Sequence, residues 1–237
     1  MRAARKQQRL HPPQQARSRA TLERVLGATQ ELLAEKRFEE TTVVEIVRRA
    51  GSSVGSFYAR FPDKRSLLAR LDRDLFEKGR VQWDALLDPR RWEGRRAGEI
   101  VDEVAALLVW KNRAFAPLLA ALALDSRSGP NSRFVHGARR LNEHVVEKLS
   151  ALLLARRREI AHPNPRRAIE VGLLMIAAAA REAILFGDTL LSGAGTDDCD
   201  LVSELARAYR SYLGIRAAHA KIPERRLTKR GRRILSR

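Results

Sequence analysis

The sequence predicts an all-α protein, and two observations lead to this prediction. Between residues 20 and 215 the apolar residues recur at the three- and four-residue spacing of helices. No segment shows the sustained two-residue alternation, bounded by turn residues, that is typical of a strand. Prolines and glycines divide the region into about nine helical segments, so we expect packed helices without a sheet.

The predicted helices follow one another along the whole central region. The first covers about residues 22–33, where Leu22, Val25 and Leu26 begin an apolar stripe. Two short helices cover about 43–50 and 54–60. A fourth begins near Asp63, behind Pro62, and runs toward Trp83. Five further helices are expected near 98–112, 117–124, 132–158, 165–187 and 198–213.

The charge of the chain is strongly positive and is concentrated at its two ends. The 237 residues include 46 Lys and Arg against 28 Asp and Glu, a formal net charge of +18. Residues 1–19 contain six basic residues and no acidic one, and residues 216–237 contain nine basic residues and one acidic one. Such ends are either solvated tails or arms that grip phosphates, and the charge favours an anionic partner such as nucleic acid.

Cysteine usage and hydropathy indicate a soluble protein of the cytoplasm. The single cysteine, Cys199, excludes an internal disulfide framework and a cysteine-based zinc cluster. The basic N-terminus is not followed by the apolar stretch of an export signal. The longest apolar run, 171–180, is far shorter than the ~20 residues that cross a bilayer.

Residues 41–60 have the pattern of a helix-turn-helix. Thr42 and Glu45 have the spacing of a capping box, which starts the first short helix. Gly51 follows that helix, where a left-handed residue permits a sharp turn, and Ser53 stands at the N-cap of the next. A tight glycine turn between two short helices is typical of a helix-turn-helix, although spacing alone also fits an ordinary α-hairpin.

The residues themselves resemble a known family. The segment TTVVEIVRRAGSSVGSFYARFPDK, residues 41–64, closely resembles the DNA-binding segment of the TetR (tetracycline-repressor) family, and the resemblance extends over about residues 18–70. Two positions depart from the usual pattern: Ser52 replaces an apolar residue, and Val54 replaces Lys or another polar residue. The resemblance implies four parts: a basic arm (1–17), a helix-turn-helix domain (18–65), a helical regulatory and dimerisation domain (66–215) and a basic tail (216–237).

The resemblance also implies roles for individual residues toward DNA. Thr42, Tyr58 and Lys64 are expected to contact phosphates, which set the register of the protein on the duplex. The N-terminal arm is expected to reach a minor groove, with Arg17 and Arg19 adding charge. The residues expected to face the major groove are Ser53, Val54, Ser56 and Phe57. Because Val54 stands where a polar residue is usual, it either lacks that residue's polar contact with DNA or contacts a thymine methyl group instead.

The regulatory half is expected to hold a pocket for a small apolar effector. The resemblance favours a pocket, although the same apolar residues also fit a filled core. The residues expected to line it are Leu107, Leu108, Trp110, Phe115, Leu118, Leu122, Phe134, Leu141, His144 and Val145.

The last two long helices have the spacing of a dimer interface. Each shows an apolar stripe, and two such helices from each of two chains form a four-helix bundle. The expected interface residues are Val171, Leu174, Ala178, Leu185, Leu201, Leu205, Tyr209 and Tyr212. A two-fold dimer favours a pseudo-palindromic operator on double-stranded DNA.

Other chemistries are less consistent with the sequence. Residues 51–55 match G-x-S-x-G, but the strand that must precede a hydrolase nucleophile is not predicted. The five histidines lack H-E-x-x-H spacing, so we expect neither a metal nor a cofactor, and no enzyme. The predicted function is a homodimeric DNA-binding regulator, a repressor released by its effector. The alternative is a basic architectural protein with weak sequence preference.

Overall fold

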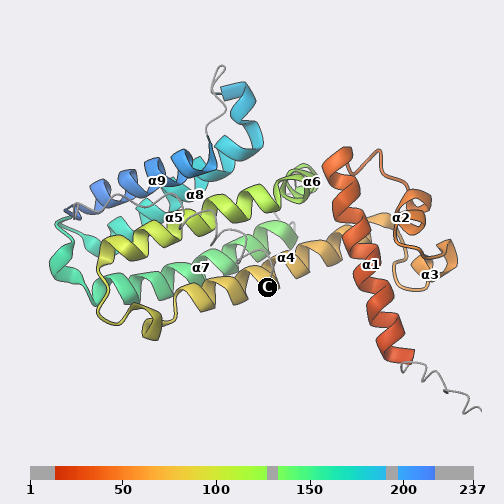
Figure 1. Ribbon diagram of the computed structural model, residues 1–237, viewed down its shortest axis with the longest axis horizontal. Helices are drawn as coiled ribbons and strands as arrows, with labels where there is room; N and C mark the ends of the chain where they lie inside the picture. The colour runs from red at the N-terminus through yellow and green to blue at the C-terminus, as the bar shows by residue number, and fades with distance from the viewer. Residues whose placement is uncertain (1–13, 127–132, 191–196, 217–237) are drawn as a thin grey trace, which may run out of the picture. The chain divides into compact units, whose positions relative to one another are not determined.

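The computed structural model describes residues 14–126, 133–190 and 197–216. Within those residues it contains helices and no strand, which confirms the predicted all-α fold (Figure 1). The α-helices are α1 (Gln14–Glu35), α2 (Val43–Arg49), α3 (Val54–Tyr58), α4 (Lys64–Leu86), α5 (Ala97–Ala114), α6 (Ala116–Ser126), α7 (Arg133–Leu154), α8 (Pro165–Leu190) and α9 (Asp198–Leu213). Residues 1–13 and 217–237, which include most of the predicted arm and tail, lie outside the described residues.

The structure differs from the prediction mainly at two helix boundaries and in one 3-10 turn. Helix α1 begins at Gln14, so Arg17 lies in its first turns and not in an arm that precedes the domain. Helix α7 ends at Leu154, and the chain continues in a 3-10 turn, Arg157–Glu159. A second 3-10 turn, Pro89–Trp92, was not predicted; the buried Trp92 indole holds it by donating to the Leu86 carbonyl at 2.6 Å.

The chain divides into two compact units within α4. Unit 1 is Met1–Leu71 and unit 2 is Asp72–Arg237. The sequence placed this boundary between residues 65 and 66. The difference arises because the first turns of α4 belong to the core of unit 1, where Leu67 is fully buried.

Unit 1 packs α1, α2, α3 and the start of α4 around a small apolar core. The core residues are Val25, Ala28, Leu32, Ile46, Val47, Ala50, Phe57, Phe61 and Leu67. Ion pairs between Glu35 and Arg49, and between Lys36 and Glu45, join the end of α1 to α2. Burial of apolar area supplies most of the stability, and these exposed pairs add little.

Unit 2 is organised around α5, which packs against α8 and α9, while α7 packs against α8. One face of α5 is buried along its length, at Ala97, Ile100, Val101, Val104 and Ala105. The close approach of α8 and α9 depends on Gly172, because a Cβ there would collide with the ring of Tyr209. The Tyr209 hydroxyl donates to the Ile169 carbonyl at 2.7 Å, so this polar atom is satisfied inside the core.

No single helix among the described residues is both long and apolar enough to cross a membrane. Helices α5 and α6 reach that length and composition only as a pair, which is bent by 73°.

Candidate nucleic-acid interface

Two short helices of unit 1, α2 and α3, are joined by a turn that only glycine adopts without strain. Gly51 has φ 57°, in the left-handed region, where a Cβ is unfavourable. The Gly51 amide donates to the Arg48 carbonyl at 3.2 Å, and the Ser52 amide donates to the Val47 carbonyl at 2.8 Å. These bonds end α2 and fix the direction in which α3 leaves.

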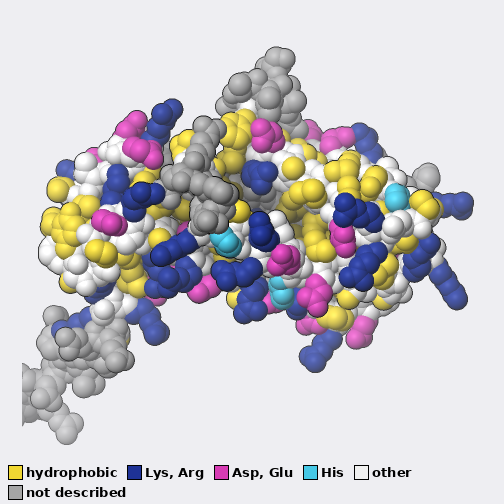
Figure 2. All heavy atoms as spheres, turned by 180° about the vertical axis from the view of Figure 1, so that it is seen from behind, with side chains coloured by type: hydrophobic (Ala, Val, Ile, Leu, Met, Phe, Trp, Pro, Cys, Tyr) yellow, Lys and Arg dark blue, Asp and Glu magenta, His cyan; other side chains and the backbone are white. Residues whose placement is uncertain are grey.

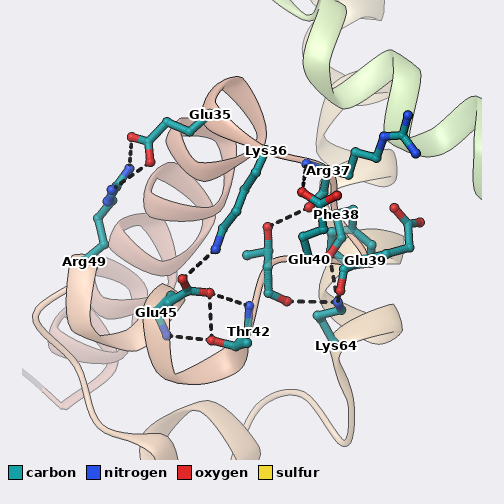
Figure 3. A network of polar contacts seen from close by, with 11 residues as sticks. Glu35, Lys36, Arg37, Phe38, Glu39, Glu40, Thr42, Glu45, Arg49 and Lys64 are labelled. Carbon is teal, nitrogen blue, oxygen red and sulfur yellow. Dashed lines mark hydrogen bonds and ion pairs between the residues drawn. The ribbon is translucent and has the colours of Figure 1, made fainter.

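Side-chain caps start both helices, as the sequence predicted. The Thr42 hydroxyl accepts from the Glu45 amide at 3.3 Å, and the Glu45 carboxylate accepts from the Thr42 amide at 2.9 Å, which completes the capping box (Figure 3). Ser53 Oγ accepts from the Ser56 amide at 3.1 Å and caps α3. The helix-turn-helix geometry therefore follows from local sequence.

The capping box occupies the groups of Thr42 that were expected to bind a phosphate. The Thr42 amide and hydroxyl both donate to Glu45 Oε2, at 2.9 and 2.8 Å. Hydrogen bonds from Lys36 and from Thr42 lower the pKa of Glu45 to about 2, so the carboxylate is ionised at neutral pH (Figure 3). The prediction for Thr42 is corrected, since an anion already occupies this position.

Lys64 has a structural role in place of the expected phosphate contact. Its Nζ donates to the carbonyls of Phe38, Glu39 and Thr41 at 2.7, 3.1 and 2.9 Å (Figure 3). An ammonium has three hydrogens, and all three are used. Lys64 therefore fastens the loop between α1 and α2 to the start of α4, and its predicted role is corrected.

Helix α3 has one buried side and one exposed side. Phe57, which was expected to face the major groove, is only 1% exposed. Its ring packs on the ring of Phe61, with the two ring centroids 5.3 Å apart. It anchors α3 to unit 1, so that prediction is wrong. Val54 and Tyr58, four residues apart and hence on one helical face, are 41% and 52% exposed.

Two arginines that the sequence reasoning did not single out hold the ends of this site together. Arg60 donates to Ser56 Oγ at 2.9 Å and to Ser18 Oγ at 3.0 Å, so it ties α3 to α1. Arg24 donates to the Ala50 carbonyl at 3.0 Å, at the end of α2. No local motif signals the contacts of Arg60 with Ser18 and of Arg24 with Ala50, because each joins residues far apart in the sequence.

The remaining basic residues of unit 1 are distributed over its surface. Arg17 and Arg19 are exposed on α1, and Arg48 is exposed on α2. On the face of the molecule seen in Figure 2, Lys and Arg side chains lie among acidic and apolar ones.

The residues predicted to line an effector pocket lie in unit 2. Leu107, Leu118, Leu122 and Val145 are buried, whereas the others are half-buried. Phe134 packs on Phe76 with ring centroids 5.7 Å apart. His144 Nε2 lies 2.7 Å from Asp84, which joins α7 to the unit 2 part of α4.

A groove of about 570 Å³ lies between α7 and α8 in unit 2. It shares only Phe134 with the predicted pocket. The other lining residues are Val135, Ala138, Arg139, Asn142, Glu143, Val146, Glu170 and Arg181. The groove is open to solvent and combines apolar with charged side chains.

The predicted interface stripes of α8 and α9 differ in exposure. Leu174 is 66% exposed, and Val171, Ala178 and Leu185 are half-buried. On α9, Leu201, Leu205 and Tyr209 belong to the core of the unit, while Tyr212 is half-buried. The prediction for the three buried residues is corrected, because α9 turns that stripe toward α5 and α8 of the same chain.

Comparisons with known proteins agree with this geometry. The family model described as bacterial regulatory proteins, tetR family, matches residues 25–71. No curated protein matches the sequence. A transcriptional regulator from Cytophaga hutchinsonii ATCC 33406 is similar in structure, with a TM-score of 0.62 and 19% identity, over 82% of this chain and 97% of that one.

Two further solved structures are similar over comparable lengths. A putative TetR-family transcriptional regulator from Mesorhizobium loti MAFF303099 has a TM-score of 0.59 and 16% identity, over 84% of this chain and 98% of that one. The regulator FadR from Bacillus subtilis, solved in complex with stearoyl-CoA, has a TM-score of 0.54 and 18% identity, over 82% and 99%. At these identities the likeness shows the fold.

The helix-turn-helix of unit 1 and the helical unit that follows it share their fold with these solved structures. The family model for bacterial regulatory proteins, tetR family, therefore matches the segment that contains the helix-turn-helix of unit 1, residues 25–71.

Proposed function

We propose that the protein is a sequence-specific DNA-binding regulator that acts as a homodimeric repressor and leaves its operator when a small apolar effector binds. One observation carries the DNA-binding part: α3 is anchored by Phe57 and presents Val54 and Tyr58 outward behind a glycine turn. A short helix held in this way can enter a major groove without rearrangement of unit 1.

The DNA contacts divide into positioning and reading groups. The exposed Tyr58 hydroxyl donates to a phosphate, and Arg17 and Arg19 add charge from α1. Ser53 caps the N-terminus of α3, and Ser56 accepts a hydrogen bond from Arg60. Their main contribution to DNA binding is therefore to fix the orientation of α3. Base reading falls to the exposed face of α3.

Selection of bound duplexes from a random pool tests this part of the proposal. We expect a pseudo-palindrome bound at least 10³-fold more tightly than random duplex at physiological salt. A ratio near one would contradict sequence-specific binding and favour the architectural alternative, in which the basic ends coat DNA.

The outward-facing apolar stripe of α8, which is half-buried except at the exposed Leu174, supports a homodimer. Val171, Leu174, Ala178 and Leu185 lie on one side of the helix, and Leu174 is the most exposed. Glu170 and Arg181 lie along one edge of this stripe, eleven residues or about 16 Å apart, beside the groove that faces α7. When a second α8 packs antiparallel across the stripe, Glu170 of each subunit meets Arg181 of the partner subunit, once at each end of the contact.

Sedimentation of four variants tests the dimer. Leu174→Glu places a charge in the proposed interface and is expected to yield monomers. Val81→Glu alters another exposed apolar residue, on α4, and is expected to leave the dimer intact. Arg181→Glu is expected to weaken the dimer, and Glu170→Arg with Arg181→Glu to restore it. An unchanged mass for Leu174→Glu would contradict this interface.

The effector part rests on unit 2. The groove between α7 and α8 and the half-buried residues beside Phe134 offer apolar surface for a small molecule. Two proteins of similar fold guide the choice of function and probe: FadR from Bacillus subtilis, which was solved with stearoyl-CoA, and NalD, the secondary repressor of the MexAB-OprM efflux pump in Pseudomonas aeruginosa. Binding to one conformation shifts the population away from the DNA-bound one.

Titration of the protein–operator complex with a long-chain acyl-CoA, followed by other apolar compounds, tests release. A hundredfold loss of operator affinity requires a hundredfold difference in effector affinity between the two conformations. Binding of the compound without any change in operator affinity would contradict an effector role for that compound.

A further inference from the structure

The two serine side chains at the start of α3, Ser53 and Ser56, are already engaged within unit 1. Ser53 Oγ accepts from the Ser56 amide, and Ser56 Oγ accepts from Arg60. The same arginine also donates to the Ser18 hydroxyl and to the Ser56 carbonyl, so it is fixed between α1 and α3. Bidentate recognition of a base requires a freely oriented amide, guanidinium or carboxylate, and α3 itself offers none.

The face that α3 leaves open is apolar at its first turn. Val54 is the first residue of the helix and is 41% exposed, and the next residue, Gly55, has no side chain to shield it. Tyr58 lies one turn further along the same face, with its ring packed edge-on against Phe57 at 5.4 Å. The leading side chain on this face therefore ends in two methyl groups.

Thymine is the base whose major-groove edge offers an apolar group, the C5 methyl. We propose that Val54 reads a thymine in each half-site by contact with that methyl group, and that α3 discriminates sequence mainly by apolar contact. This inference rests on the proposed DNA-binding function and adds to it the chemistry of recognition. A thymine replaced by uracil retains its hydrogen-bonding groups and loses only the methyl group.

Substitution of single thymines by deoxyuridine in the selected operator tests the proposal. With the unaltered protein, one thymine per half-site is expected to show a loss of affinity of about three- to fivefold on substitution, the effect of one buried methyl group. With Val54→Ala, that same position is expected to become insensitive to the substitution.

Two further variants serve as controls for this experiment. Val44→Ala makes the same truncation at another valine, which is 62% exposed on α2. This variant is expected to lose affinity on deoxyuridine substitution as the unaltered protein does. Val54→Ile keeps an apolar branched side chain and is also expected to lose affinity in this way. Thermal unfolding of each variant, followed by circular dichroism, identifies any that do not fold.

The outcomes separate this inference from the proposed function. Failure to select any operator overturns the proposed function. An operator that is bound specifically but tolerates deoxyuridine at every position overturns the inference alone. Equal sensitivity in the unaltered protein and in Val54→Ala also overturns it, because the methyl group is then read by another residue.

Discussion

The two units of this protein are held together in different ways. Unit 1 has a small core and many polar links: the capping box of Thr42 and Glu45, and Lys64 bound to three carbonyls. Unit 2 has a larger apolar core into which two charged groups are partly withdrawn, Asp102 and Lys111. Unit 2 also contains ion pairs between helices, such as Arg113 with Asp198 and Arg210 with Asp102, so the two units differ mainly in the size of the apolar core whose burial supplies stability.

Truncation of Phe57 is expected to have the largest effect. Phe57→Ala removes a fully buried ring from a core of nine residues and is expected to lower the free energy of unfolding of unit 1 by about 3–5 kcal/mol. Denaturant titration, monitored by circular dichroism, measures it. Tyr58→Phe, one residue further, is expected to leave stability unchanged and to weaken DNA binding about equally on all duplexes. Comparable destabilisation by both changes would contradict the orientation of α3.

A methyl group added at Gly172 tests the packing of unit 2. A Cβ there collides with the Tyr209 ring, which is only 1% exposed, so Gly172→Ala is expected to cost about 1–3 kcal/mol. The control is Gly27→Ala in α1, where no heavy atom lies within 4 Å of the added Cβ. That change is expected to stabilise unit 1 by about 0.5–1 kcal/mol. Thermal unfolding of both variants gives the comparison, and equal effects would argue against close packing of α8 on α9.

Removal of the Lys64 ammonium separates a structural role from a phosphate contact. Lys64→Ala leaves the carbonyls of Phe38, Glu39 and Thr41 without this donor and is expected to lower the free energy of unfolding by about 1–3 kcal/mol. The slope of log affinity against log salt is expected to remain unchanged, because no counterion release depends on this group. If the slope for Lys64→Ala is smaller by about one and its stability is unchanged, the result would support a phosphate contact of Lys64 and contradict the structural role.

The pH dependence of stability is expected to differ between the units. Burial raises the pKa of Asp102 to about 6, although Arg210 lies 2.9 Å away, and burial lowers the pKa of Lys111 to about 8. The native state therefore binds more protons than the unfolded state between about pH 4 and 6, and fewer between about pH 8 and 10.5.

The direction of each pKa shift decides whether stability rises or falls with pH. Asp102 makes unit 2 less stable as the pH rises from 4 to 6, and Lys111 makes it more stable as the pH rises from 8 to 10.5. Glu45 acts in unit 1, where stability is lost as the pH falls from 4.5 toward 2. Denaturant titrations across pH measure all three. Asp102→Asn and Lys111→Met are expected to flatten the first and second trends, and trends unchanged in these variants would refute the assignments.

Much of the helix-turn-helix could be predicted because its signals are local. The capping box, the turn glycine and the Ser53 cap each involve residues within a few positions of one another, and the structure contains all three. The all-α fold followed from apolar periodicity in the same way. Of the residues predicted on α8 for the interface, Leu174 is exposed and Val171, Ala178 and Leu185 are half-buried, and which residues a partner covers stays a prediction.

The errors share a different cause. Phe57 and Tyr58 are adjacent aromatic residues, and only the position of α1 and of Phe61 decides which of them is buried. Tyr209 fits an interface stripe by spacing, but Gly172, thirty-seven positions earlier, makes the space that buries it. Lys64 donates to carbonyls of the loop between α1 and α2, which lies more than twenty positions earlier in the sequence. Periodicity shows that a face is apolar, and it does not show which neighbour covers that face.

Tyrosine nitration, mapped by mass spectrometry with and without the selected operator, tests most directly whether the exposed side of α3 meets DNA. The chain contains three tyrosines: Tyr58 is exposed, Tyr212 is half-buried and Tyr209 is buried. We predict that Tyr58 is nitrated in the free protein and protected by saturating operator, while Tyr209 stays unreactive in both samples. Nitration of Tyr58 at the same rate in the saturated complex would contradict the account.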